Sequence, residues 1–302
     1  MNYDCVIVGG GPAGLSAALI LGRCLRRVVV CDVGEQRNWR SRAMHGYLTR
    51  DGAAPADFYR IAREELRRYD TVEFCHIEVT DALREPGGFR VICSDGTQLL
   101  GRTLLLATGV MDELPRLEGL TELYGTSVHH CPYCDGWEWR GQPVAVYGSG
   151  ESGVALALGL TRWTSDLVLC TGQADGLPEG GNTRLAAAGI AVRQEPVIRL
   201  EGQGGWLERV VFAGGPAIER RALFFCGDQR QRSPLAERLG CRFTEKGAVD
   251  TGKCEATDVP GLYVAGDASK EAQFVVVATS EGAEAGMAIN QALLRDDVKE
   301  QR

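Results

Sequence analysis

The feature that most constrains the fold is a pattern that occurs twice, an apolar strand followed by a glycine-rich turn, a helix and a second apolar strand. The first copy reads YDCVIVGGGPAGLSAALILGRCLRRVVVCD, and the second reads PVAVYGSGESGVALALGLTRWTSDLVLCT. The first predicts a strand at 5–8, a turn at 9–14, a helix at 12–22 and a strand at 27–31. The second predicts a strand at 143–147, a turn at 148–153, a helix to about 161 and a strand at 167–171. Because strands that alternate with helices form parallel sheets, the sequence predicts an α/β fold.

Each turn has the spacing G-x-G-x-x-G directly after a strand and at the start of a helix, which is the context typical of dinucleotide binding. In the first copy, Gly9 makes the tight turn, Gly11 lets the backbone approach a pyrophosphate, and Gly14 lets helix and strand pack closely. The helix N-terminus offers free N–H groups to that pyrophosphate. Asp32 ends the second strand, where its carboxylate can accept from a ribose hydroxyl. A turn that binds no nucleotide is the alternative.

The second copy carries Gly148, Gly150 and Gly153 at the same spacing. Thr171 stands where the first copy has Asp32. Neither an acid for a free 2′-hydroxyl nor a basic cluster for a 2′-phosphate is present there. Two such units predict two dinucleotides, although a glycine turn without nucleotide is a stronger alternative for this copy than for the first.

Composition excludes several classes of function. The net charge is −7, from 33 basic and 40 acidic residues. The sequence therefore has no excess of positive charge of the kind that binds nucleic acid or an anionic membrane. No apolar run is long enough to span a membrane. The chain begins directly with a strand and turn rather than a signal sequence, so we expect a cytoplasmic protein. Most of the eleven cysteines are isolated, which also indicates a reducing compartment.

Cys131 and Cys134 form the one close cysteine pair, in HHCPYCDGWEW. The pair is open to three interpretations: a redox disulfide, half of a zinc site, or two ordinary thiols. A zinc site would recruit His129 or His130, but the sequence has no second C-x-x-C or spaced histidine pair to complete a tetrahedron. We therefore expect no metal.

Five landmarks, taken in order, resemble the low-molecular-weight, thioredoxin reductase-like flavoproteins. They are GGGPAG at 9–14, LLLATG at 104–109, CPYC at 131–134, GSGESG at 148–153 and VPGLYVAGD at 259–267. The resemblance spans nearly the whole chain. The cysteine pair lies after LLLATG and just before the second glycine turn, which separates this family from glutathione reductase-like relatives.

The resemblance implies two Rossmann-like domains, with a nicotinamide-type domain at 116–242 inserted into a discontinuous FAD domain at 1–115 and 243–302. It also implies a helix that begins near Thr279 and aims its positive end at the flavin N1–O2 edge. The implied FAD residues are Gly9, Gly11, Pro12, Ala13, Gly14, Asp32, Thr108, Gly109, Gly266, Asp267 and Gln273. Segment 37–52 looks like the flavin-contacting loop of a branch that includes fungal dithiol oxidases, which adds His45 and Gly46. The nicotinamide would bind at Gly148, Gly150 and Gly153.

For the cysteine pair, a redox disulfide fits best, because the disulfide of a C-x-x-C motif at a helix N-terminus forms easily and is easily reduced. The resemblance implies that Cys134 faces the flavin and that Cys131 attacks the partner disulfide. Asp135 would be the acid–base group. Related dithiol oxidases often carry His at that position, so Asp135 favours a reductase. We expect His129 and His130 to be loop or packing residues.

Two features leave the substrates open. NADPH-using reductases carry a basic cluster of the H-R-R-x-x-x-R kind after the second strand, whereas this chain reads LVLCTGQADGLPEGG. NADPH specificity is therefore not supported, and the donor is NADPH, NADH or another compound. Three aromatic residues lie close to the pair in sequence: Tyr133, Trp137 and Trp139. We expect them either to shield the flavin, to dock a protein partner, to line a pocket for a small disulfide, or simply to pack between the domains.

The leading hypothesis is an FAD-dependent disulfide reductase that passes electrons from a nicotinamide or other donor, through the flavin and Cys131–Cys134, to thioredoxin or another disulfide. By analogy with the family we expect a homodimer. The first alternative is an oxygen-using oxidase that forms a disulfide in a small molecule. The second is a flavin-bearing redox sensor or binding protein.

Overall fold

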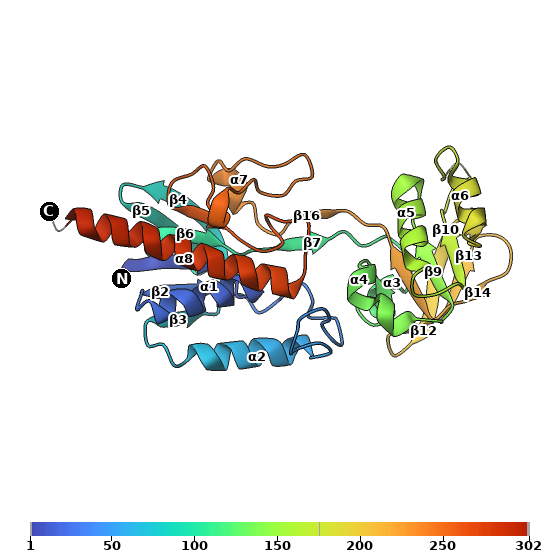
Figure 1. Cartoon of the computed structure of the whole chain (residues 1–302), viewed down its shortest axis with the longest axis horizontal. Helices are drawn as coiled ribbons and strands as arrows, with labels where there is room; N and C mark the ends of the chain where they lie inside the picture. The colour runs from blue at the N-terminus through green and yellow to red at the C-terminus, as the bar shows by residue number, and fades with distance from the viewer. Residues whose placement is uncertain (1, 175, 301–302) are drawn as a thin grey trace. The chain divides into compact units, whose positions relative to one another are not determined.

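The computed structural model describes residues 2–174 and 176–300, and these divide into two compact units (Figure 1). Unit 1 consists of Met1–Trp39, Ala53–Met111 and Arg230–Arg302, and unit 2 consists of Arg40–Gly52 and Asp112–Gln229. The larger segment of unit 2 is thus inserted into a discontinuous unit 1. This confirms the predicted fold class.

The sequence predicts a division of the chain according to the nucleotide that each domain is expected to bind. That division stays a prediction. It assigns 1–115 and 243–302 to FAD and 116–242 to the nicotinamide. The compact units instead divide after Met111 and after Gln229, and segment 40–52 clusters with unit 2.

The main sheet of unit 1 has the strand order β3-β2-β1-β6-β5-β4, and β17 also pairs with β6. Strands β3, β2, β1, β6 and β17 are parallel to one another, whereas β4 and β5 continue the sheet antiparallel. The strands are β1 (Asn2–Val8), β2 (Val28–Cys31), β3 (Val72–Cys75), β4 (Val79–Glu85), β5 (Gly88–Cys93), β6 (Gln98–Leu106) and β17 (Leu262–Val264).

The unit contains the helices α1 (Pro12–Arg23), α2 (Pro55–Leu66), α7 (Leu235–Arg238), the short η2 (Lys253–Glu255) and α8 (Val275–Glu300). Helices α1, α2 and α8 cover one face of this sheet, and the short α7 packs on the other. Helices α1 and α8 run side by side in close contact (Figure 1). Along β1, Cys5 and Ile7 pack into the core shared with α1 and α8, whereas Val6 and Val8 pack into the core on the opposite face. Successive side chains of a strand point to opposite faces, so burial on both sides explains the unbroken apolar run.

Unit 2 has a parallel sheet with the order β11-β10-β9-β15-β8 and a smaller antiparallel sheet with the order β12-β13-β14. Its strands are β8 (Val128–His129), β9 (Val144–Tyr147), β10 (Leu167–Cys170), β11 (Ala191–Arg193), β12 (Val197–Gln203), β13 (Trp206–Phe212), β14 (Ile218–Glu219) and β15 (Ala222–Phe225). Its helices are α3 (Leu120–Leu123), α4 (Pro132–Asp135), η1 (Gly136–Trp139), α5 (Gly150–Leu160) and α6 (Gly181–Ala187). Strands β7 (Val110–Asp112) and β16 (Gln229–Gln231) pair where the chain passes between the units.

The parallel sheet of unit 2 lies between two apolar layers. Val144 and Val146 of β9 pack with α5 and α6, while Ala145 packs with the antiparallel sheet on the other face. This is again the alternation expected of a buried parallel strand. The carboxyl end of β9 therefore presents its glycine turn at the edge of a rigid, doubly covered sheet.

Both predicted strand–turn–helix–strand units are present, with ends that differ from the prediction by at most three residues. The prediction that the last helix begins near Thr279 is wrong, because α8 begins at Val275. The N–H of Ala278 already donates to the carbonyl of Phe274, and the Thr279 hydroxyl donates back to Val276 O inside the helix. A run of valines favours strand by propensity, but packing of α8 against α1 overrides that preference.

None of the helices within the described residues is long and apolar enough to cross a bilayer.

Candidate functional site

The first glycine turn connects β1 to α1, and its glycines meet different local demands. Gly9 has φ +109°, and a Cβ there would lie 2.2 Å from the carbonyl oxygen of Ala107. A Cβ on Gly14 would lie 1.9 Å from Gly9 O, so the helix could not pack so closely against the turn. A Cβ added to Gly11 would meet no heavy atom within 4 Å apart from its chain neighbours. The open space at the start of a helix is what a pyrophosphate requires, and the turn therefore fits FAD. Pro12 and Ala13 follow as the first two residues of α1.

Asp32 follows β2 and is held by contacts to one of its oxygens. Its Oδ2 accepts from Gln36 Nε2 at 3.1 Å and from the guanidinium of Arg63. Arg63 in turn lies over the ring of Phe74, 5.5 Å from its centroid. The mostly buried carboxylate thus has a set orientation, and Oδ1 is the oxygen that a ribose hydroxyl would use. Sequence reasoning found Asp32 but missed Arg63, which lies on α2.

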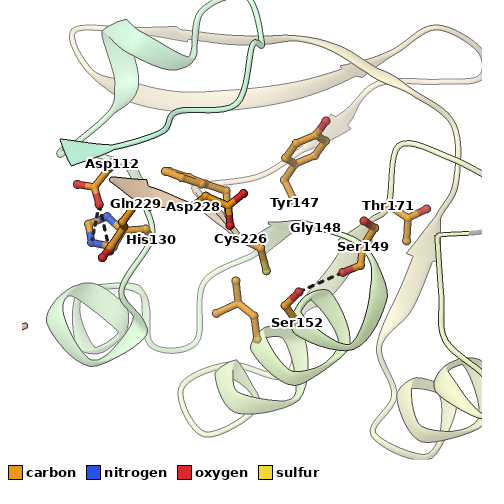
Figure 2. Close-up of a pocket in the computed structure, with 13 residues that line it drawn as sticks. Asp112, His130, Tyr147, Gly148, Ser149, Ser152, Thr171, Cys226, Asp228 and Gln229 are labelled. Atoms are coloured by element: carbon orange, nitrogen blue, oxygen red, sulfur yellow. Dashed lines mark hydrogen bonds and ion pairs between the residues drawn. The ribbon is translucent and has the colours of Figure 1, made fainter. Parts of the chain in front are cut away.

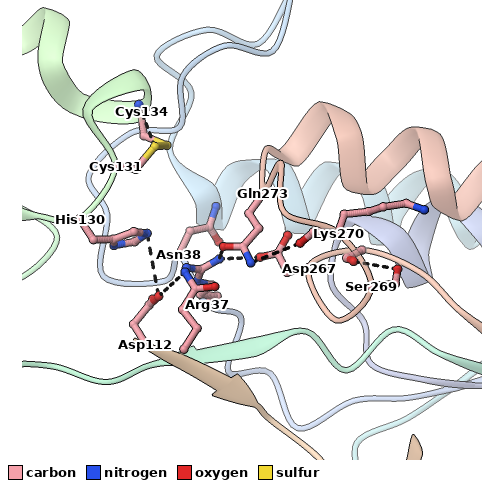
Figure 3. Close-up of polar contacts among 12 residues, drawn as sticks. Arg37, Asn38, Asp112, His130, Cys131, Cys134, Asp267, Ser269, Lys270 and Gln273 are labelled. Atoms are coloured by element: carbon pink, nitrogen blue, oxygen red, sulfur yellow. Dashed lines mark hydrogen bonds and ion pairs between the residues drawn. A yellow bond between two sulfur atoms is a disulfide. The ribbon is translucent and has the colours of Figure 1, made fainter. Parts of the chain in front are cut away.

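The residues predicted for the other end of FAD are joined by an arginine that sequence reasoning did not single out. Arg37 Nη1 donates to Asp267 Oδ2 at 2.9 Å and to Gln273 Oε1 at 2.6 Å (Figure 3). Gly266 has φ +85°, and a Cβ there would lie 3.1 Å from Cβ of Ala13. The turn that carries Asp267 is therefore packed against the first turn of α1.

Glu281 is a buried carboxyl that sequence reasoning also missed. It lies on α8, is 5% exposed, and its Oε2 accepts the N–H of Gly266 at 2.7 Å. The pKa of Glu281 is raised to about 7, chiefly by burial and also by the neighbouring Glu255 and Asp267, against the lowering effect of the Gly266 N–H and Lys270. An acid in a helix is usually a surface residue, so the sequence carries no signal for this contact.

Thr108 and Gly109 follow β6 directly. Gly109 has φ +68°, and its carbonyl oxygen accepts the N–H of Arg232. His45 and Gly46 belong to the segment of unit 2 at 40–52. His45 Nε2 lies 3.5 Å from Glu138 Oε1, and the N–H of Gly46 donates to Asp51 Oδ1. The flavin contacts predicted for these four residues stay a prediction.

Cys131 and Cys134 are joined as a disulfide, with 5.3 Å between their Cα atoms (Figure 3). Cys131 is the N-cap of α4, and its Sγ accepts the N–H of Cys134 at 3.2 Å, while Pro132 begins the helix. A backbone N–H aimed at a sulfur stabilises its thiolate form. Within 2–174 and 176–300, no three His, Cys, Asp or Glu side chains converge as metal ligands would.

Asp135 ends α4 and contacts a buried histidine. Its Oδ1 lies 3.3 Å from Nδ1 of His129, and Nε2 of the same ring accepts the indole N–H of Trp139 at 3.1 Å. His129 is 5% exposed and Trp139 is 9% exposed. The structure thus brings Trp139, His129 and Asp135 together in a row. The pattern HHCPYCDGWEW contains all three residues, but only the fold of β8 and η1 reveals that they meet.

The other aromatics near the pair are exposed. Tyr133 is 76% exposed and Trp137 is 63% exposed. Tyr133 makes an edge contact with Trp163, at 6.0 Å between centroids, and the guanidinium of Arg140 lies over Trp137. Packing alone therefore explains Trp139 but not Tyr133 and Trp137.

His130 belongs to a second polar group in unit 2. Its Nδ1 lies 3.1 Å from the hydroxyl of Tyr124, and that hydroxyl donates to Asp112 Oδ2 at 3.0 Å. His130 and Asp112 both line the pocket drawn in Figure 2.

The second glycine turn connects β9 to α5 and shares with the first the close packing of its third glycine against its first. A Cβ on Gly153 would lie 2.8 Å from Gly148 O, and one on Gly148 would lie 2.8 Å from Cys226 Sγ. Gly150 has φ +62° and open space beside it. An open pocket begins at this turn; its lining includes Gly148, Ser149, Ser152, Thr171, Cys226 and Asp228 (Figure 2).

The wall of this pocket near Thr171 carries no cation among the described residues. The Thr171 hydroxyl donates to Gln173 O at 2.8 Å. Arg184 Nη1 contacts both carboxylate oxygens of Glu151, at 2.7 and 2.9 Å, and Arg193 pairs with Glu195. Asp175, in the acidic segment noted in the sequence, lies outside the described residues.

Outside the pair, the buried cysteines are inert by environment. Burial raises the pKa of Cys5 and of Cys170 to about 12, and it raises the pKa of Cys31 as well. The thiolate is the reactive form of cysteine, so these side chains remain thiols at neutral pH. The buried thiols are therefore unreactive, whereas Cys24 and Cys254 are free and exposed.

Comparisons with known proteins give a consistent result. The family model described as pyridine nucleotide-disulphide oxidoreductase matches residues 3–282. The thioredoxin reductase tcpT of Claviceps purpurea is 32% identical over 308 residues, covering 97% of this chain and 95% of that protein. The crystal structure of the putative thioredoxin reductase TrxB from Bacillus anthracis is 32% identical with a TM-score of 0.93, covering 98% and 99% of the two chains. The crystal structure of HlmI is 34% identical with a TM-score of 0.94, covering 99% and 95%.

The matched model spans most of the chain, and the relatives match it from end to end. The predicted family and the predicted use of FAD are confirmed, and the turn around Gly11 has the space that this cofactor requires. The chain therefore belongs to the pyridine nucleotide-disulphide oxidoreductase family, and it is a thioredoxin reductase-like, FAD-dependent disulfide oxidoreductase.

Proposed function

We propose that this enzyme reduces an external disulfide through Cys131 and Cys134. The observation that carries the proposal is the disulfide at the start of α4, where the N–H of Cys134 already contacts Cys131 Sγ. That contact would stabilise Cys131 as a thiolate once the disulfide is open. Asp135, the next residue, is an acid–base group within the same turn of chain.

When bound and reduced by the electron donor, FAD would supply an electron pair to the Cys131–Cys134 disulfide and return to its oxidised form, and two protons would complete the two thiols. The thiolate of Cys131 then attacks one sulfur of the substrate and forms a mixed disulfide, releasing the first substrate thiol. Cys134 attacks Cys131 Sγ, which releases the second substrate thiol and restores the Cys131–Cys134 bond. Asp135 takes the proton from the attacking thiol and returns one to the leaving sulfur.

The FAD site that we propose lies in unit 1. The turn Gly9–Gly14 would hold the pyrophosphate, and Asp32 would accept from the ribose through Oδ1. Asp267 and Gln273, both contacted by Arg37, would lie at the ribityl and pyrimidine end. Supporting this assignment, each of these residues is held by neighbouring side chains or by the sheet.

The proposed nicotinamide site is the pocket at the second glycine turn. Its geometry supports binding of a pyrophosphate, but Thr171 and the paired Arg184 offer nothing for a 2′-phosphate. We therefore propose a weak preference between NADPH and NADH. The same observation favours one second candidate function, the oxidation of a dithiol to a disulfide with oxygen as electron acceptor.

The proposed substrate is a thioredoxin-like protein or a small-molecule disulfide. The exposed rings of Tyr133 and Trp137 support a docking surface beside the pair, since aromatic side chains that are large and exposed favour contact with a partner. The names of the relatives support thioredoxin for those proteins. We propose a homodimer by analogy with the family.

Anaerobic flavin spectroscopy tests the proposal. The holoenzyme is mixed with NADPH or NADH in separate experiments, and oxidised thioredoxin is added afterwards. Bleaching of the flavin by a nicotinamide, followed by its return with thioredoxin, is the expected result. A flavin that bleaches with a dithiol and recovers with oxygen, but is inert to both nicotinamides, supports the oxidase instead.

A further inference from the structure

The contact between Asp135 and His129 is the strongest unassigned feature of the cysteine site. Asp135 Oδ1 and His129 Nδ1 are 3.3 Å apart, in a nearly buried environment. His129 lies on β8, whose pairing with β15 places the ring 5.3 Å from that of Phe224. The ring is therefore held by a strand and by packing, whereas Asp135 lies at the end of a single helical turn.

Trp139 determines which nitrogen of His129 carries the proton. An indole N–H can only donate a hydrogen bond, and it lies 3.1 Å from Nε2. Nε2 must therefore present its lone pair. A neutral imidazole with an acceptor at Nε2 carries its proton at Nδ1, and Nδ1 faces Asp135. Trp139 is in turn held by an edge contact with Trp206, at 6.1 Å between centroids.

From this arrangement we infer that His129 is a positioning residue for Asp135. Its Nδ1–H, fixed by Trp139, donates to the carboxylate and holds it in one orientation. Asp135 is thus kept ready to accept the proton of a cysteine thiol. The inference deepens the proposed function and rests on it, because it assumes that Asp135 is the acid–base group of the pair.

Few other charged groups surround this row. Glu138 of η1 is three residues beyond Asp135 and contacts His45 Nε2 at 3.5 Å. His130 is adjacent in sequence but contacts Tyr124. The two cysteines and Tyr133 are also titratable, and the Arg42 guanidinium lies over the Trp206 ring that contacts Trp139, while Trp139 and Phe224 themselves carry no charge. An effect of His129 on the pH profile is therefore separable from the effects of Glu138 and His45 by a control at Glu138.

A matched pair of amide variants tests the inference. In His129→Asn, the side-chain nitrogen occupies roughly the place of Nδ1 and still donates to Asp135. In His129→Gln, the amide reaches the place of Nε2 and serves Trp139 instead. Both bury one amide, so both lose similar stability. Glu138→Gln serves as the charge control.

Two readouts are compared in each holoenzyme: the pH dependence of disulfide reduction, and that of iodoacetamide labelling of the reduced cysteine pair. We expect His129→Asn and Glu138→Gln to keep the wild-type profiles. His129→Gln should move the acid limb of the rate profile upward by about one pH unit, the size expected for one lost hydrogen bond to a charged group, so that the rate on this limb falls by about tenfold. Equal effects of both His129 variants, or none, would show that His129 only packs.

The wild-type protein supplies a test that needs no variant to fold. The chain has 4 histidines, so nitrogen-15 labelling of histidine gives few signals. One ring should show a protonated Nδ1 and an unprotonated Nε2 at neutral pH, and Trp139→Phe should alter that ring. If the ring that responds to Trp139→Phe, which is that of His129, is protonated at Nε2 instead, the inference is overturned. Failure of the proposed function would differ from this, since a wild-type enzyme without disulfide reductase activity leaves the labelling and nitrogen-15 readouts intact.

Discussion

Cys131 and Cys134 differ in their surroundings although they share one bond. The backbone N–H of Cys134 contacts Cys131 Sγ, and this contact does not depend on the side chain at 134. A change at Cys134 should therefore leave α4 folded and leave Cys131 accessible as a thiolate. The roles of the two sulfurs can be separated by single substitutions.

Cys134→Ser should abolish disulfide reduction while leaving FAD binding intact. The serine cannot form the bond that releases a substrate held on Cys131, so a mixed disulfide should accumulate. Thiol counting with and without a reductant, together with the flavin absorbance, measures both effects. Cys24→Ser is the control, because Cys24 is free and exposed. A reductant-dependent thiol count that Cys134→Ser leaves unchanged would show that the pair is not the redox centre.

Asp135→Asn should slow turnover by roughly 10²–10⁴-fold, the range for loss of a general acid–base group. The amide keeps the size of the side chain and can still contact His129, so the fold and the FAD content should stay near wild type. Steady-state rates at several pH values measure the effect. A rate close to wild type would make Asp135 a structural residue at the end of α4.

The glycine turn at the start of α1 shows how an element prepares a binding site. Gly11 has φ −76° and ψ −175°, which any residue can adopt, and nothing lies within 4 Å of an added Cβ. Gly11→Ala should therefore fold with wild-type stability but weaken FAD binding by about tenfold or more, because the methyl group occupies the space of the pyrophosphate. Gly14→Ala should instead destabilise the protein by about 1–3 kcal/mol, because its Cβ would collide with Gly9 O. FAD titration of the apoprotein and thermal unfolding distinguish the two variants, and equal FAD affinity of Gly11→Ala and wild type would contradict the assigned site.

Helix α8 makes stability depend on pH through Glu281. Its pKa is raised from 4.5 to about 7 in the folded state, chiefly by burial. The stabilisation is therefore complete below pH 4.5 and is lost as the pH rises through 7, which amounts to at most about 3 kcal/mol. Glu281→Gln keeps an oxygen that accepts the Gly266 N–H, and it should remove this part of the pH dependence. Urea unfolding at pH 5 and pH 8 gives the free energy of unfolding of each protein at the two pH values. If that free energy changes by the same amount in both proteins, the prediction is contradicted.

Elements that depend on neighbouring residues could be predicted from the sequence, whereas contacts between distant ones could not. The two glycine turns and their strands follow from local backbone demands and from burial on both faces. The start of α8 could not be predicted in this way, because contact with α1 overrides the preference of its valines for strand. Arg37 reaches Asp267 and Gln273 across more than two hundred residues, and no local pattern indicates such a contact. The row from Trp139 to Asp135 is close in sequence, but it depends on β8 and η1 meeting.

At the scale of the whole molecule, each of the two units has its own glycine turn at the carboxyl edge of its own parallel strands. The unit with the cysteine pair also contains the pocket at Gly148. Charge-assisted hydrogen bonds contribute about 1.5–3 kcal/mol each, so the absence of two arginines removes about two to four decades of NADPH preference.

We therefore expect slow flavin reduction by NADPH and NADH at comparable rates, or near-inertness to both. Stopped-flow measurement of flavin reduction against the concentration of each nucleotide checks this. Gln173→Arg, next to the Thr171 wall, should shift the preference toward NADPH by supplying a guanidinium. Tight, fast and NADPH-selective reduction of the wild-type enzyme would contradict the interpretation of this pocket.

The central claim is that one FAD and the Cys131–Cys134 disulfide form a single redox unit, and reductive titration tests it most directly. The anaerobic holoenzyme is titrated with dithionite while flavin absorbance and free thiols are followed. Since FAD and a disulfide each accept two electrons, the account predicts uptake of about four electrons per FAD in wild type and about two in Cys134→Ser. Uptake of about two electrons in both proteins, with no new thiols in the wild type, would contradict the claim.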